Sequence, residues 1–109
     1  PAIPFAETLT GGWADGRVTT PAYWSAQLRR TVRFADAVRT VRSDAATVGK
    51  APAFLEVGPG NTLATFAAEA AATDGGGALC LSSLPAPHDR RTDTEVMLGV
   101  VRDQGHTLV

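Results

Sequence analysis

Cysteine is almost absent from this 109-residue sequence, which contains only Cys80. A single thiol cannot form an internal disulfide, and its place in the apolar run 78–81 predicts a small buried residue in a reducing compartment. An excess of charge is also missing. Ten basic and eleven acidic residues give a formal net charge of -1. This balance provides no broad attraction for nucleic acid or an anionic membrane surface, so we expect neither as a partner.

Long hydrophobic segments are absent as well. No apolar run approaches the roughly 20 residues that span a bilayer, and the sequence from Pro1 shows neither the basic region nor the hydrophobic stretch of a signal peptide. We therefore expect a cytoplasmic protein. The sequence begins without Met, inside a segment that looks extended, which favours a piece cut from a larger protein.

A nucleophile with a base is missing too. The pattern Gly-x-Ser-x-Gly does not occur, and His88 and His106 lie in a Pro- and Arg-rich loop and near the end, which favours solvated surface residues over catalytic ones. Neither CxxC nor HExxH is present, so we expect no metal site and no cofactor bound by this segment. The serines that lack the flanking glycines are Ser25, Ser43, Ser82 and Ser83.

Helix signals, by contrast, are clear. Thr20 and Pro21 predict the start of a short helix over 21–29, with Trp24 and Leu28 on one apolar face. A second helix is predicted from Phe34, with its end in 43–49. The apolar face of this second helix contains Phe34, Val38 and Val41.

Two further helices are predicted in the second half. Asn61 is a candidate cap for 62–72, and Thr92 with Glu95 has capping-box spacing ahead of a last helix that ends near Gly105. The expected apolar stripe of the third helix consists of Leu63, Phe66, Ala67 and Ala70.

Three short segments have the composition of strands. Residues 3–10 lead into Gly11-Gly12 and predict a short strand and a turn. The apolar run 53–57 is typical of a strand buried on both faces of a parallel sheet, and 78–84 is predicted to be another short apolar strand. Alternating elements of this kind predict an α/β fold with short parallel strands and flanking helices. Three strands form a thin sheet, whose edges would need to be covered by further chain.

Three polar features leave alternatives open. The turn 58–61 precedes a helix start and favours a structural turn over a phosphate cradle, because a complete phosphate-binding motif is missing. Glu56 lies between apolar residues, which favours an ion pair or backbone contacts over acid-base work. Five arginines, interrupted by Asp36 and Asp44, favour a solvated face over a basic binding surface. These arginines are Arg29, Arg30, Arg33, Arg39 and Arg42.

Several motifs resemble one family. Tyr23-Trp24, the run 27–30 and the run 32–38 are similar to a helical segment of the acyltransferase domains of modular polyketide synthases, the malonyl-CoA:acyl carrier protein transacylase family. The run 54–63 follows at the spacing of that family's strand and Gly-Pro turn. The resemblance covers nearly all of residues 1–109 and identifies them as the C-terminal segment of one acyltransferase domain, without its nucleophile elbow and its ferredoxin-like insert.

The resemblance implies a function for the parent enzyme. This segment would form the end of the α/β-hydrolase-like large subdomain. The parent enzyme would transfer a malonyl-type unit from coenzyme A, through a serine, to the phosphopantetheine thiol of an acyl carrier protein. The expected partners are that carrier protein, the acyl-CoA substrate, the rest of the domain and the adjoining synthase domains. The alternative is a non-catalytic scaffold or carrier-protein-docking module from a degenerate acyltransferase.

One site residue is implied within this segment. In the family, a Gln or Asn at the position of Gln27 orients the catalytic histidine through its backbone carbonyl, as the acid does in a serine protease triad. The nucleophile and the histidine precede this sequence, so the segment alone is predicted to be inactive. Because the carbonyl belongs to the main chain, the residue type at 27 is expected to matter little.

Overall fold

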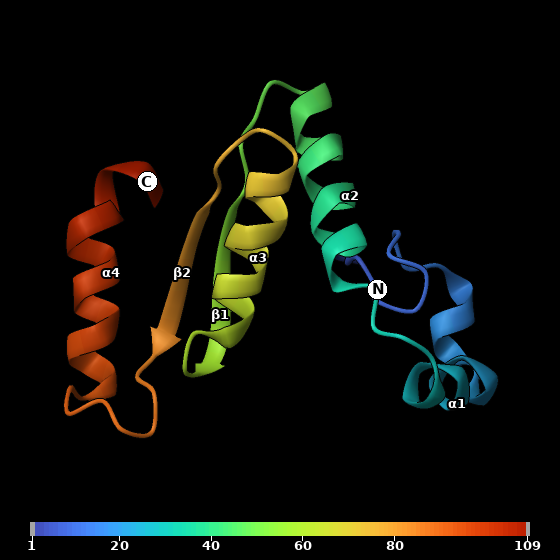
Figure 1. Cartoon of the computed structure of the whole chain (residues 1–109), viewed down its shortest axis with the longest axis horizontal. Coiled ribbons are helices and arrows are strands. Elements are labelled where there is room, and N and C mark those ends of the chain that lie inside the picture. Colours follow the sequence, from blue (N-terminus) through green and yellow to red (C-terminus); the bar gives the residue numbers. More distant parts are fainter. Residues whose placement is uncertain (1, 109) are drawn as a thin grey trace. The chain divides into compact units, whose positions relative to one another are not determined.

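The structure is a computed structural model that describes the backbone of residues 2–108 and the side chains of residues 2–102 (Figure 1). The chain divides between Pro52 and Ala53 into two compact units. The first contains a single 3-10 turn, η1 (Gly16–Thr19), and two helices, α1 (Pro21–Arg29) and α2 (Phe34–Thr47). The second contains β1 (Ala53–Pro59), α3 (Thr62–Thr73), β2 (Leu79–Leu84) and α4 (Asp93–Leu108).

Helix α1 has the bounds that its sequence predicts. The Thr20 hydroxyl accepts a hydrogen bond from the Tyr23 N–H at 3.3 Å, and the helix ends where Arg30 adopts an extended backbone. The predicted apolar face is wrong, because Trp24 is 56% exposed and Leu28 is 88% exposed. Tyr23 is the buried residue of α1 instead. The burial of α1 therefore depends on a residue with a polar tip.

Helix α2 confirms its predicted apolar face. Val38 is 4% exposed and lies between the half-buried Phe34 and Val41. After the last turn, Gly49 has a φ of +67°, and its N–H donates to the Ala46 carbonyl at 3.0 Å. A glycine in this conformation is the usual way to end a helix, because a side chain would be strained there.

The segment 3–10 does not form the predicted strand. Its one β contact among the described residues is an isolated antiparallel bridge between Ala6 and Trp13. The Glu7 N–H donates to the Gly12 carbonyl at 2.8 Å, so the chain has already turned back on itself. Because the turn follows so soon, the segment pairs with its own continuation and not with a sheet.

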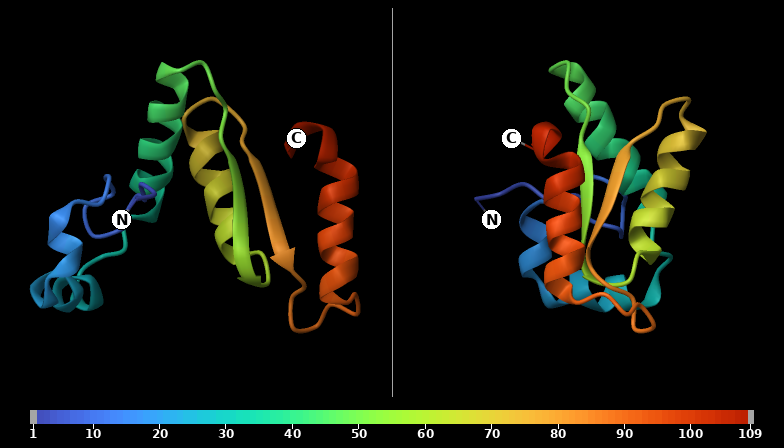
Figure 2. Two further views of the ribbon diagram at one scale, coloured as in Figure 1. Left: turned by 180° about the vertical axis from the view of Figure 1, so that it is seen from behind. Right: turned by 90° about the vertical axis from the view of Figure 1, so that its left-hand side faces the viewer.

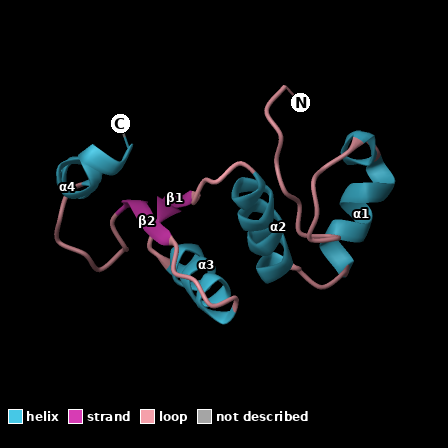
Figure 3. Cartoon of the chain, turned by 90° about the horizontal axis from the view of Figure 1, so that it is seen from above, coloured by secondary structure: helices cyan, strands magenta, loops and turns pink. Residues whose placement is uncertain are grey.

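The second unit is a parallel strand pair with a helix on either side. Strands β1 and β2 run parallel, with Phe54 opposite Cys80 and Glu56 opposite Ser82. Figures 2 and 3 show α3 and α4 on opposite sides of the pair, where α3 contacts both strands and α4 contacts β2. The predicted α/β class with parallel strands and flanking helices is confirmed. In the described part of the chain, the sheet has two strands and not three.

Packing in this unit uses small side chains. Helix α3 buries four alanines, whereas Leu63 and Phe66 of the predicted stripe are half exposed. Strand β1 is covered on one face only, since Leu55 is 49% and Val57 is 84% exposed, so the prediction of a strand buried on both faces is wrong. Small side chains let a helix approach a strand pair closely, which explains the preference for alanine. The four alanines are Ala64, Ala67, Ala70 and Ala71.

The last helix confirms its capping box and extends beyond its predicted end. The Thr92 N–H donates to Glu95 Oε2 at 2.7 Å, and the Glu95 N–H donates to Thr92 Oγ1 at 3.3 Å. The helix continues past Gly105 to Leu108. Within the described residues, no helix combines the length and the apolar character that crossing a membrane requires.

The cap of α3 differs from the prediction. The Asn61 side chain makes no capping hydrogen bond, and Glu56 on β1 takes that role, because its Oε2 accepts from the Ala64 N–H at 2.9 Å. A carboxylate at a helix N-terminus also interacts favourably with the helix dipole. Glu56 therefore makes the backbone contact that its apolar surroundings predicted.

This arrangement predicts unequal effects of two alanine substitutions. Glu56→Ala removes the acceptor of the Ala64 N–H and is expected to lower the free energy of unfolding by about 1 kcal/mol. Asn61→Ala removes no capping bond and is expected to change it by less than about 0.5 kcal/mol. Urea unfolding of both variants measures the difference. A larger loss for Asn61→Ala would contradict the assignment of the cap.

Candidate functional site

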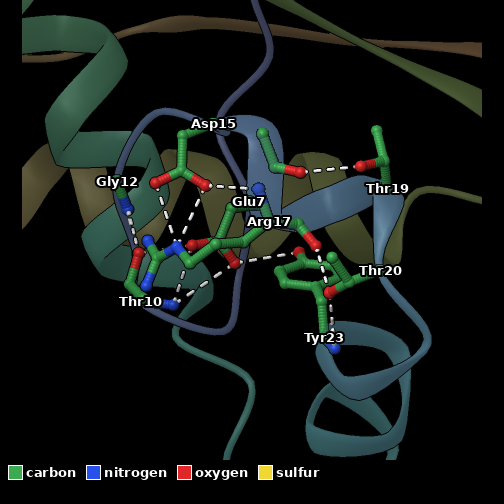
Figure 4. Close-up of polar contacts among 9 residues, drawn as sticks. Glu7, Thr10, Gly12, Asp15, Arg17, Thr19, Thr20 and Tyr23 are labelled. Atoms are coloured by element: carbon green, nitrogen blue, oxygen red, sulfur yellow. Dashed lines mark hydrogen bonds and ion pairs between the residues drawn. The ribbon is translucent and has the colours of Figure 1, made fainter.

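A buried carboxylate organises the loop that precedes α1. Glu7 is 5% exposed, and its oxygens accept hydrogen bonds from the N–H groups of Leu9 (2.6 Å) and Thr10 (3.1 Å) and from the Thr10 hydroxyl. The Tyr23 hydroxyl of α1 adds a further bond at 3.0 Å (Figure 4). We call residues 7–12 the Glu7 loop. Its turn is closed around its own carboxylate.

These contacts keep the carboxylate charged. Burial alone would raise the pKa of Glu7, but the bonds from the Thr10 hydroxyl, the Leu9 and Thr10 N–H groups and the Tyr23 hydroxyl lower it below its ordinary value of 4.5. Burial and the same bond raise the pKa of Tyr23, so that its hydroxyl remains a donor. Glu7 and Tyr23 are therefore held together as an anion and a neutral phenol.

The Glu7 loop also contacts both helices of the first unit. Gln27, one turn after Tyr23 on the same face of α1, donates from Nε2 to Thr8 Oγ1 at 2.7 Å. The Arg33 N–H, just before α2, donates to the Thr8 carbonyl at 2.7 Å, and the Thr40 hydroxyl of α2 donates to the Gly11 carbonyl at 2.6 Å. One turn of chain thus fixes the end of α1 and the start of α2.

Gln27 is the predicted site residue, and it lies in the last turn of α1. The last hydrogen bond of the helix runs from the Arg30 N–H to the Ala26 carbonyl, at 3.0 Å. The next carbonyl along the chain, that of Gln27, accepts no hydrogen bond from a described residue. The side-chain oxygen Oε1 of Gln27 is also buried without a partner among the described residues. A helix end offers such carbonyls to donors from outside the helix.

The other candidates for chemistry are not brought together. Ser25 and Ser43 are exposed on separate helices, and Ser82 and Ser83 lie on β2. His88 is exposed in a loop, and the side chain of His106 lies outside the described residues. Within residues 2–102, no three His, Cys, Asp or Glu side chains lie together in a group that could hold a metal ion.

The turn after β1 fits the structural interpretation. A helix N-terminus can hold an anion, but at α3 the Glu56 carboxylate already occupies the Ala64 N–H. The turn itself depends on Gly60, which has a φ of +98°. We therefore assign it as a structural turn that connects the end of β1 to the start of α3.

The arginine-rich face is neutralised locally. Asp36 forms ion pairs with Arg33 at 2.7 Å and with Arg39, and all three side chains are partly exposed. The hydrogen bond from Arg33, followed by the attraction of both arginines, lowers the pKa of Asp36. Surface pairs of this kind contribute little to stability, and the solvated-face interpretation accounts for them.

A surface hollow lies in the described part of each unit. In the first unit, an open depression of about 660 Å³ lies between the Glu7 loop and α2, with Trp13, Asp36 and Ser43 in its lining. In the second unit, a hollow of about 340 Å³ lies at the carboxyl ends of β1 and β2, with Ser82 and Asp89 in its lining. Neither lining contains a histidine or a cysteine.

Comparison with known proteins gives a consistent answer. The chain is 36% identical over 74 residues, or 67% of its length, to naringenin synthase of Pestalotiopsis fici. It is 51% identical over 39 residues, or 36% of its length, to polyketide synthase GfsE of Streptomyces halstedii, and 41% identical over 76 residues, or 67%, to the spectinabilin polyketide synthase system protein NorC of Streptomyces orinoci. These similarities support a polyketide synthase segment.

The chain spans 3%, 1% and 3% of the length of these three relatives. No model of a known protein family matches the sequence. No solved structure matches it either.

Most contacts of the Glu7 loop in this polyketide synthase segment were not predicted from its sequence. No role was predicted for Glu7 or for the hydroxyl of Tyr23, although the spacing Glu7-x-x-Thr10 ahead of two glycines is present in the sequence. A carboxylate three residues before a hydroxyl can fill a turn by hydrogen bonding to its N–H groups, and this signal could have indicated the loop. The bond between Gln27 and Thr8 has no comparable signal, because 19 residues separate them.

Proposed function

We propose that this polyketide synthase segment is the C-terminal part of an acyltransferase domain. The observation that carries the proposal is the backbone carbonyl of Gln27, which lies in the last turn of α1 and has no donor among the described residues. It stands in the motif where the resembling family places the carbonyl that orients the catalytic histidine. The similarity to polyketide synthases supports the same assignment.

In the proposed reaction, a serine elsewhere in the parent attacks the thioester carbonyl of a malonyl-type acyl-CoA. The histidine takes the serine proton and passes it to the coenzyme A sulfur as the carbon–sulfur bond breaks. The phosphopantetheine thiol of an acyl carrier protein then attacks the acyl-serine ester. The histidine takes the thiol proton and passes it to the serine oxygen as the carbon–oxygen bond of the ester breaks. Gln27 contributes by accepting a hydrogen bond that orients the histidine and stabilises its charged form.

The proposed setting is a cytoplasmic multienzyme whose adjoining domains and carrier protein are the partners. This segment binds no cofactor of its own in the proposal, and the acyl-CoA and the phosphopantetheine are substrates of the parent. The chain contributes the base-orienting carbonyl, part of the α/β core and the helix that presents the carbonyl.

Acylation of the intact parent polypeptide tests the function. Incubation with malonyl-CoA is expected to add one acyl group, measured as a mass shift of the parent, while the 109-residue chain alone remains unmodified because it lacks the nucleophile. A shift on the isolated chain would contradict the placement of the nucleophile outside it. A parent that accepts no acyl group from malonyl-CoA or methylmalonyl-CoA would favour the alternative, a non-catalytic scaffold or carrier-protein-docking module.

A further inference from the structure

Polar contacts connect α1 to the Glu7 loop. Its large apolar side chains Trp24 and Leu28 are mostly exposed, and its buried residue is Tyr23, whose hydroxyl donates to Glu7. Gln27 makes the second contact, to Thr8. Two successive loop residues therefore meet two helix residues four positions apart, which defines both the rotation and the axial position of the helix.

Thr8 makes two hydrogen bonds near the end of the helix that carries the Gln27 carbonyl. Its hydroxyl accepts from Gln27 Nε2 at 2.7 Å, and its carbonyl accepts from the Arg33 N–H at 2.7 Å. Gln27 lies in the last turn of α1, just before the short connection 30–33, and Arg33 is the last residue of that connection. Movement at Thr8 is thus transmitted to both ends of the connection, including the last turn of α1.

We propose that Thr8 and the side chain of Gln27 are positioning residues, which hold the Gln27 backbone carbonyl where the catalytic base meets it. This inference rests on the proposed function. It gives the Gln27 side chain a role that the family resemblance does not require. A base that is misplaced by a fraction of an ångström loses rate while substrate binding is retained, since neither residue contacts the acyl-CoA in the proposal.

Single-turnover acylation of the intact parent by malonyl-CoA measures this role. Thr8→Val keeps the shape of the side chain but removes the acceptor, and Gln27→Met keeps the length but removes the donor. Each is expected to lower the rate constant at saturating malonyl-CoA by about tenfold, with the half-saturating concentration and the amplitude unchanged. Thr8→Ser is expected to restore most of the rate. Thr73→Val, which changes an exposed threonine of α3 in the same way, is the matched control.

The outcomes separate this inference from the proposed function. Unchanged rate constants in both variants, with normal acylation of the unsubstituted parent, would overturn the positioning role and leave the function intact. A reduced amplitude with an unchanged rate constant would also overturn it, because the contact would then serve folding alone. If the unsubstituted parent is not acylated, both proposals are wrong. If Thr8→Val does not fold, the rate constant of Gln27→Met decides.

Discussion

Replacement of Glu7 by alanine is expected to lower the free energy of unfolding of the chain by about 3 kcal/mol, among the largest effects of any single side chain here. The substitution leaves the N–H groups of Leu9 and Thr10 and the hydroxyl of Tyr23 without their acceptor. Each buried donor without a partner is unfavourable by about 1–3 kcal/mol, and relaxation of the loop recovers part of the sum.

Urea unfolding at neutral pH measures this effect, and Glu69→Ala provides the control. Glu69 is exposed on α3, and no hydrogen bond of its carboxylate closes a turn. Its replacement is expected to change the free energy of unfolding by less than about 0.5 kcal/mol. Equal losses in the two variants would show that the Glu7 carboxylate does not organise the loop.

The same position has a pH signature. Because the pKa of Glu7 is lowered on folding, the unfolded chain binds more protons between the folded value and the ordinary value of 4.5. The stabilisation by Glu7 is therefore complete above pH 4.5 and is lost as the pH falls through the folded value. The difference in unfolding free energy between the wild-type chain and Glu7→Gln is expected to decrease over this acidic window. A difference that grows as the pH falls would contradict the sign.

Elements whose limits depend on neighbouring residues could be predicted from the sequence. Pro21 after a hydroxyl residue fixed the start of α1, and Thr92 with Glu95 fixed that of α4, because helix starts are determined by side chains within one turn. The parallel strands followed from short apolar runs separated by a helix. The family resemblance indicated Gln27 as a candidate site residue, and in the structure Gln27 lies in the last turn of α1.

Contacts between distant residues could not be predicted. Asn61 was the local candidate for the cap of α3, but Glu56 reaches the helix across the turn and competes successfully for the Ala64 N–H. Helical periodicity likewise predicted an apolar face of α1 at Trp24 and Leu28, but it could not show that the Glu7 loop covers a different face. The contact between Gln27 and Thr8 depends on the turn at Gly11 and Gly12, which brings the loop beside the helix.

That turn depends on a glycine, and Gly11→Ala is expected to destabilise the chain by about 3 kcal/mol or more. Gly11 has a φ of +79°, where a side chain is strained, and a Cβ atom there would lie 2.4 Å from the Cβ of Asp36. The collision is with atoms close to the backbone of α2, which cannot rotate away. Relief requires the loop to move from α2, which breaks the bond from the Thr40 hydroxyl to the Gly11 carbonyl.

Gly49→Ala separates the two causes of this effect. Gly49 also has a positive φ, +67°, but a Cβ there would meet nothing within 4 Å. Its replacement therefore adds backbone strain alone, about 1 kcal/mol. Urea unfolding of the two variants is expected to show a loss at Gly11 that exceeds the loss at Gly49 by about 2 kcal/mol, the contribution of the collision with α2. Equal losses would mean that the Glu7 loop does not pack against α2 at Gly11.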